Sequence, residues 1–159
     1  MLASTLAARR RNNPEDGFTL IELMVVVLII AILIAIAIPT FLGARSRAQD
    51  RAAQSSLRNA LTAAKTIYTD AEDYTQATPG ATGSLVGVEP SLSFVAAAST
   101  GPNEIYVNPV SASVIQMAAQ SKSNTCMWIQ DNTAGPGTQY AKTNGACTTT
   151  APTTWLSSW

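Results

Sequence analysis

The chain has 159 residues, and its ten basic and ten acidic side chains give a net charge of zero. A protein that holds nucleic acid through phosphate contacts needs a basic face, so this balance argues against such a binder while leaving nucleic acid open as a partner. The chain contains no histidine, which removes the commonest general base and metal ligand and excludes every Ser-His or Cys-His catalytic pair. We therefore expect neither an enzyme nor a cofactor or metal site.

A short polar leader begins the chain. It carries three consecutive arginines, Arg9 to Arg11, followed by two asparagines, Pro14, Glu15 and Asp16. A basic segment before an apolar run is typical of targeting signals and is left out of fold reasoning. We therefore assign residues 1–17 to a leader.

A membrane-length apolar segment follows, from Phe18 to Ile38. As a helix at about 1.5 Å per residue it spans about 31 Å, the thickness of the hydrocarbon core of a bilayer. A plain membrane anchor and a secretory signal peptide are two alternatives. The second is disfavoured because the small-residue site at residues 35–37 lies inside the apolar run and no polar region precedes it.

Glu22 is the single ionisable residue in this run, and neither alternative explains it. A carboxylate inside a membrane is expensive and needs a partner. Cleavage between Gly17 and Phe18 would create an amine four residues before Glu22, on the same chain or on a neighbouring one. The helix macrodipole would also favour a negative charge at this end.

Residues 17–22, Gly-Phe-Thr-Leu-Ile-Glu, after a basic leader and before an apolar helix, resemble the class III signal of type IV prepilins. The resemblance extends over roughly residues 9–50 and is closest to the type IVa group. Glu22 is the fifth residue after the presumed cut, as in that family. Pro39 falls where many members have a helix-breaking proline.

The resemblance implies a sequence of events. A prepilin peptidase cuts after Gly17 and N-methylates Phe18. The subunit waits as a single-span protein of the cytoplasmic membrane, and an assembly platform with minor pilins then extracts it into an extracellular helical filament of identical chains. Glu22 is expected to pair with the Phe18 amine of an adjacent subunit during docking.

Beyond the apolar segment, assigned to residues 18–39, the pattern becomes amphipathic over residues 40–74. Pro39 cannot donate its amide, so a break, either a kink or local melting, is expected there. One helical face then carries apolar residues at spacings of three and four: Leu57, Leu61, Ala64, Tyr68 and Ala71. We expect the helix to end near residue 73 or 74 and its second half to pack on a head.

The head comprises residues 75–159. Residues 75–103 are rich in glycine, proline and small polar residues and predict a connecting loop. Four strand-like runs follow, at Glu104–Val107, Ser113–Ala118, Thr125–Gln130 and Gln139–Lys142. The expected fold is α+β: a long N-terminal helix packed on a small antiparallel sheet of about four strands.

Two cysteines, Cys126 and Cys147, lie in the last quarter of the chain. A pair in a small polar domain attached to a membrane span predicts a disulfide in an oxidising compartment, which places the head outside the cytoplasm. Two unpaired buried thiols are the alternative. In type IV pilins a disulfide-bounded segment near the C-terminus is a variable, surface-facing region, which this pair resembles.

The sequence thus predicts a structural subunit of a type IV pilus that serves adhesion, twitching motility or DNA uptake. A pseudopilin of a secretion or competence system, or a minor pilin, is the first alternative. A membrane-tethered binding module that never polymerises is the second. A filament subunit must be cleaved after Gly17 and must require Glu22, whereas a tethered module would be indifferent to both.

Overall fold

The computed structural model describes residues 17–80 and 82–159, so the predicted leader lies, apart from Gly17, outside the described residues. The chain divides into two compact units, one ending at Thr40 and the other running from Phe41 to Trp159. We describe each unit separately. The first contains the beginning of helix α1 (Leu20–Ala71), and the second contains the rest of that helix and the head.

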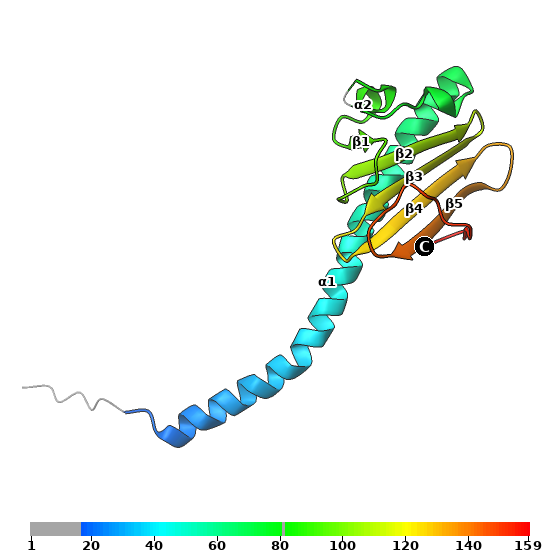
Figure 1. The fold of residues 1–159 in the computed structure, drawn as a ribbon. Helices are drawn as coiled ribbons and strands as arrows, with labels where there is room; N and C mark the ends of the chain where they lie inside the picture. The colour runs from blue at the N-terminus through cyan, green and yellow to red at the C-terminus, as the bar shows by residue number, and fades with distance from the viewer. Residues whose placement is uncertain (1–16, 81) are drawn as a thin grey trace, which may run out of the picture. The chain divides into compact units, whose positions relative to one another are not determined.

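The head is built on one five-stranded sheet in which the strands follow chain order, β1-β2-β3-β4-β5 (Figure 1). The first pair of strands is parallel and the other three pairs are antiparallel. The fold is therefore α+β, as predicted. The strands are β1 (Ser93–Val95), β2 (Glu104–Ser111), β3 (Val114–Gln120), β4 (Thr125–Asn132) and β5 (Gly137–Asn144).

The strand count of about four is corrected to five, because β1 lies inside residues 75–103, which the sequence predicts as a loop. This strand is three residues long and has turn-forming neighbours, so no alternating pattern marks it. The same stretch also contains a 3₁₀ turn, η1 (Tyr74–Gln76), and a short helix, α2 (Ser84–Val88). Tertiary pairing with β2 orders β1 although its local propensity is weak.

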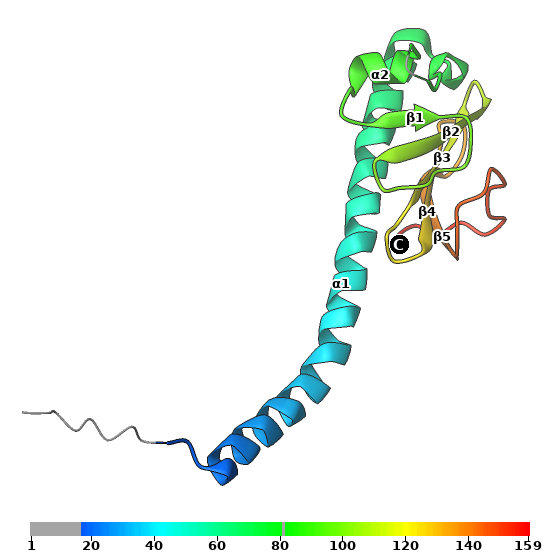
Figure 2. The same cartoon turned by 60° about the vertical axis from the view of Figure 1, so that its left-hand side comes forward.

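One face of the sheet packs on the second half of α1 (Figure 2). Successive strand residues point to opposite faces, and a row of residues that pair across three strands, Val107, Met117 and Ile129, is buried against the helix. The predicted helical face supplies Leu57, Leu61 and Ala64 to this core, with Tyr68 half-buried; its last residue, Ala71, is exposed. The predicted amphipathic stripe therefore faces the sheet along most of its length.

The opposite face of the sheet is covered by a second, smaller core that the sequence analysis does not predict. Tyr106, Ala118, Trp128 and Ala141 pair in register across β2 to β5 and form the floor of this core. Cys126 and Cys147 are disulfide-bonded and belong to the same cluster, so the predicted bond is confirmed. The bond fastens the C-terminal segment over the sheet face that is turned away from α1.

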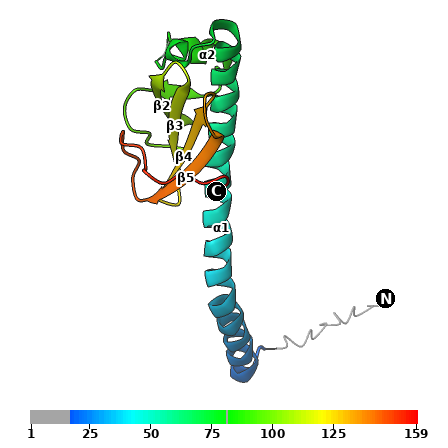
Figure 3. The ribbon, with the colours of Figure 1, turned by 90° about the vertical axis from the view of Figure 1, so that its right-hand side faces the viewer.

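The C-terminal tail follows β5 and ends beside α1 (Figure 3), and main-chain and aromatic contacts fix it in place. Leu156 and Tyr140 exchange two main-chain hydrogen bonds of 2.8 Å each. The indole nitrogen of Trp159 donates to the carbonyl of Ala141 over 3.1 Å, and its ring centroid lies 4.4 Å from that of Tyr140. The tail therefore extends the sheet edge next to β5 instead of leaving it open.

A buried polar network connects α1, η1 and the β4–β5 pair. Asp131 is 3% exposed and accepts hydrogen bonds from the hydroxyls of Tyr74 and Thr138, each over 2.6 Å. The ammonium of Lys65 lies 2.9 Å from the same carboxylate. Burial alone would raise the pKa of Asp131, but these hydrogen bonds and the Lys65 charge hold it below its ordinary value.

We expect Asp131→Asn to lower the free energy of unfolding by about 1–3 kcal/mol at neutral pH, because a charged acceptor is lost from a buried site. A lowered folded-state pKa means that the carboxylate stabilises the head above the unfolded pKa of about 3.9 and loses this contribution as the pH falls through the folded value. The difference between wild type and variant should therefore be constant above about pH 5 and shrink below about pH 4. Thermal melts of the detergent-solubilised chain across this pH range measure it. A stability difference between wild type and variant that persists undiminished at pH 2 would show that the charge of Asp131 is not its source. Tyr74→Phe is the control, because it removes a single hydrogen bond to Asp131 and leaves the carboxylate in place.

Helix α1 ends at Ala71, two or three residues before the predicted end. Glu72 has a positive φ of 54°, and its amide bonds to the carbonyl of Tyr68 over 2.6 Å, as expected of a left-handed residue that closes a helix. Asp73 then caps η1, because its carboxylate accepts from the amide and the hydroxyl of Thr75. The change of direction thus comes from capping chemistry, which the apolar pattern does not reveal.

Candidate assembly segment

The first unit exposes an apolar helix surface on all sides. Every residue from Gly17 to Thr40 is exposed, and the large apolar side chains from Phe18 to Ile38 keep between 45% and 80% of their surface accessible. Water-soluble monomers rarely expose a continuous apolar surface of this size. This segment must therefore be covered, either by lipid or by other protein chains.

Length and hydropathy show that a bilayer can cover it. Helix α1 contains an 18-residue window with a mean hydropathy of 3.3, and it is the one helix among the described residues that is long and apolar enough to cross a membrane. Helical backbone satisfies its own hydrogen bonds, as a membrane requires. By length and hydropathy, the first unit is thus suited to a membrane.

Glu22 lies at the N-terminal end of α1 and closes a capping box with Thr19. The amide and the hydroxyl of Thr19 donate to one carboxylate oxygen of Glu22, over 2.9 and 2.6 Å, and the Glu22 amide donates back to the Thr19 hydroxyl over 3.3 Å. Two donors at the start of the helix are satisfied in this way. The sequence analysis missed this role, although the signal was present as Thr-x-x-Glu immediately before an apolar run.

Phe18 and Glu22 lie on the same side of the helix end. Together with Ile21, Val25 and Val26 they line one shallow apolar hollow. The Phe18 nitrogen is an amide in the uncut chain and becomes a cation only if the bond to Gly17 is cleaved. Cleavage would therefore create a positive charge beside a carboxylate on an otherwise apolar surface, where opposite charges attract more strongly than in water.

Pro39 lies inside α1, with helical residues on both sides. The predicted local melting at this position is therefore wrong, because the helix is continuous. The predicted kink stays a prediction. The proline leaves the carbonyl of Ala35 without its usual donor. The hydroxyl of Thr40 donates to the carbonyls of Ile36 and Ala37, over 3.1 and 2.9 Å, a type of back-bonding that often bends a helix.

Residues 12–38 match the family model of the prokaryotic N-terminal methylation motif. This motif is found in the class III signal peptide of type IV pilins, which the segment resembles. The methylation motif contains Gly17, Phe18 and Glu22 and ends one residue before Pro39. Neither the comparison with curated proteins nor the comparison with solved structures finds a match to the chain.

The methylation motif supports a type IV pilin-like or pseudopilin precursor. It implies processing by a prepilin peptidase and assembly into pilus-like oligomers. It also fits membrane anchoring of the apolar helix before assembly. Cleavage after Gly17, methylation of Phe18 and charge pairing of Glu22 between subunits remain predictions about single residues.

Proposed function

We propose that this chain is the repeating subunit of a type IV pilus or of a closely related extracellular filament. The helices from Phe18 to Ile38 pack together in the filament, Glu22 neutralises the Phe18 amine of a neighbour, and the heads form the outer surface. The role is structural rather than catalytic. Adhesion, twitching motility and DNA uptake are properties that such a filament would provide.

One observation carries the proposal: the methylation motif contains the first part of α1, which is apolar on every side and holds a single carboxylate near its start. An anchor alone would need the apolar side chains and no carboxylate, since a charge disfavours insertion. A filament subunit needs both, because the apolar surface supplies the packing and the carboxylate supplies the register. Glu22 therefore favours a polymer over a tethered binding module.

A pseudopilin is the second candidate, because the same motif supports it. A pseudopilin would use the same cleavage and the same helix packing but would form a short fibre inside the envelope. Filaments sheared from the cell surface and imaged by electron microscopy separate the two roles. Long filaments that react with an antibody against the head support the pilus.

Gly17 offers a direct test of processing. A Cβ atom at Gly17 would meet no atom within 4 Å, so a larger side chain disturbs no contact of the described chain. We expect Gly17→Leu to block cleavage, because the peptidase must accept a small residue there, and to leave full-length protein in the membrane with no filaments. Immunoblots of membrane and sheared fractions measure both effects.

Gly87→Leu is the matched control, because Gly87 also has no atom within 4 Å of an added Cβ. It should be cleaved and assembled like the wild type. Normal cleavage and normal filaments from the Gly17→Leu chain would refute the proposed processing.

A further inference from the structure

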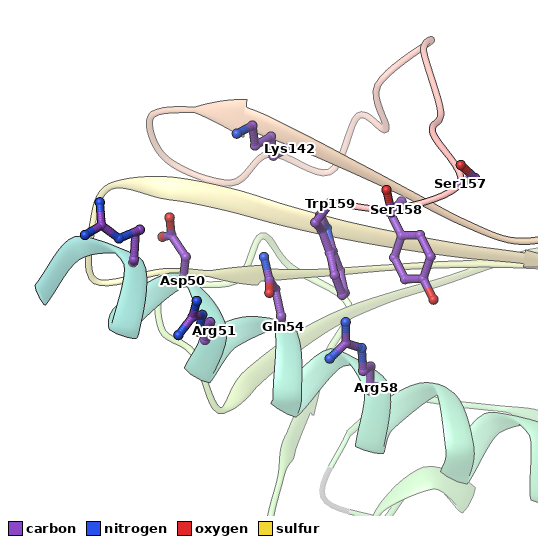
Figure 4. Close-up of a pocket in the computed structure, with 10 residues that line it drawn as sticks. Asp50, Arg51, Gln54, Arg58, Lys142, Ser157, Ser158 and Trp159 are labelled. Atoms are coloured by element: carbon purple, nitrogen blue, oxygen red, sulfur yellow. The ribbon is translucent and has the colours of Figure 1, made fainter. Parts of the chain in front are cut away.

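A basic groove lies on the head between α1, β5 and the C-terminal tail (Figure 4). Its volume is about 460 Å³. Four cationic side chains line it: Arg47, Arg51, Arg58 and Lys142. We call this surface the basic groove.

The cations of the basic groove have no carboxylate partner in the described part of the chain. Within residues 17–80 and 82–159 the one ion pair with atoms within 4.0 Å joins Lys65 and Asp131, which lie elsewhere. Among the lining residues Asp50 has the single acidic side chain, and it accepts hydrogen bonds from the hydroxyls of Ser121 and Ser123. The Arg58 guanidinium lies 5.1 Å from the centre of the Trp159 ring. The groove therefore presents an excess of positive charge.

The opposite charge gathers where α1 ends. Asp70, Glu72 and Asp73 lie within four residues of each other, and the last turn of the helix contains no basic residue. Asp70 and Glu72 are exposed. Carboxylates at a helix C-terminus are unfavourable because the macrodipole is negative there. This acidic end therefore lacks a compensating cation on its own helix.

We propose that the basic groove binds the acidic end of α1 from a second copy of this chain. The inference rests on the proposed filament and names a contact within it. The two charged regions cannot pair within one molecule: even their nearest members on the helix, Arg58 and Asp70, are 12 residues apart, about 18 Å at 1.5 Å per residue. Copies in contact would therefore be displaced along the helix axis by about 20–40 Å.

This contact joins two different surfaces of the same chain. An interface of that kind is heterologous and continues from copy to copy, which produces an open helical filament when the rotation does not close a ring. Charge complementarity would set the axial register of the heads, while the apolar helices supply the packing. The register of the polymer is thus set by charges along and just after the second half of α1 and on β5, as well as by Glu22.

Single-stranded nucleic acid is a second anion that cations and aromatic rings can bind. The second copy is favoured because the complementary surface is present on the same chain. In addition, removal of residues 1–17 leaves seven basic and eight acidic residues, so the cut chain has a net charge of −1 and lacks the net positive charge that attracts a polyanion at long range.

Charge reversal on the full-length chain tests the inference. We expect Arg47→Glu with Arg51→Glu to reduce the yield of sheared filaments by about tenfold or more, because like charges then face each other. Asp70→Lys with Glu72→Lys should reduce it similarly, while raising the melting temperature of the solubilised subunit by removing the unfavourable helix-end charges. The chain with all four substitutions should recover filaments to within about twofold of the wild type, since the attraction is restored with opposite signs.

Lys122→Glu is the matched control, because it reverses an exposed cation outside the basic groove; it should assemble normally. If the wild type forms filaments, and the Arg47→Glu/Arg51→Glu and Asp70→Lys/Glu72→Lys chains form as many, this inference is overturned and the proposed function stays intact. A second result would overturn the inference in favour of nucleic acid. In that result the chain with all four substitutions does not recover filaments, and both chains that carry the arginine reversals no longer bind a fluorescent single-stranded oligonucleotide. Absence of filaments from the wild type itself would refute the proposed function, and this contact with it.

Discussion

Glu22→Ala is expected to abolish filaments while the chain is still cleaved and inserted in the membrane. Without the carboxylate, the Phe18 amine created by cleavage would be buried among apolar helices with no counter-charge, and an uncompensated charge of this kind is strongly unfavourable. We expect at least about a hundredfold less protein in the sheared fraction. Membrane insertion should be equal or better, because a charge is removed from the span. Immunoblots of sheared, membrane and soluble fractions measure all three quantities.

The capping box makes two further variants informative. Glu22→Gln keeps a side chain that can cap the Thr19 amide but carries no charge. Thr19→Ala removes the two hydrogen bonds of the hydroxyl and keeps the charge. We expect the first to fail in assembly and the second to assemble. The reverse result would show that Glu22 acts by starting the helix, and the charge-pairing account would be wrong.

Replacing both Cys126 and Cys147 by alanine is expected to destabilise the head by about 3 kcal/mol, because the bond closes a loop across a sequence separation of 21 residues. For a domain of this size the melting temperature should fall by about 10–20 °C. Part of the loss comes from packing, since both residues belong to the core on the sheet face turned away from α1. Thermal melts in detergent followed by circular dichroism measure the change.

Reduction of the wild-type disulfide should lower the melting temperature by a similar amount, without any substitution. Thr153→Ala, an exposed change in the tail, serves as the control and should leave the melting temperature unchanged. If the double-alanine variant has the melting temperature of the wild type, in the presence and absence of reductant, the bond contributes nothing to the stability of the head.

The sequence predicts the elements whose signals are local and repeated. The apolar run from Phe18 to Ile38 has one physical solution, a helix, and the three- and four-residue spacing from Leu57 to Ala64 fixes which face meets the sheet. The disulfide follows from there being two cysteines in one small domain. The strands β2 to β5 all overlap the predicted runs, and their ends differ by a few residues.

What the sequence analysis misses depends on contacts between distant residues. The strand β1 is ordered by pairing with β2 at a distance of about ten residues in sequence and has no alternation of its own. The second core requires knowing that Tyr106, Trp128 and Ala141 align across different strands. The basic groove brings Lys142 beside α1 through the fold alone. The capping box of Thr19 and Glu22 is the exception, because its Thr-x-x-Glu pattern is present in the sequence.

The central claim is that proteolysis converts this membrane protein into a filament subunit by creating a cation for Glu22. The intact mass of protein sheared from the cell surface tests it most directly. We predict the mass of a chain that begins at Phe18, increased by about 14 Da for one methyl group on the new amine. A sheared protein with the mass of the full chain, beginning at Met1, would contradict the claim.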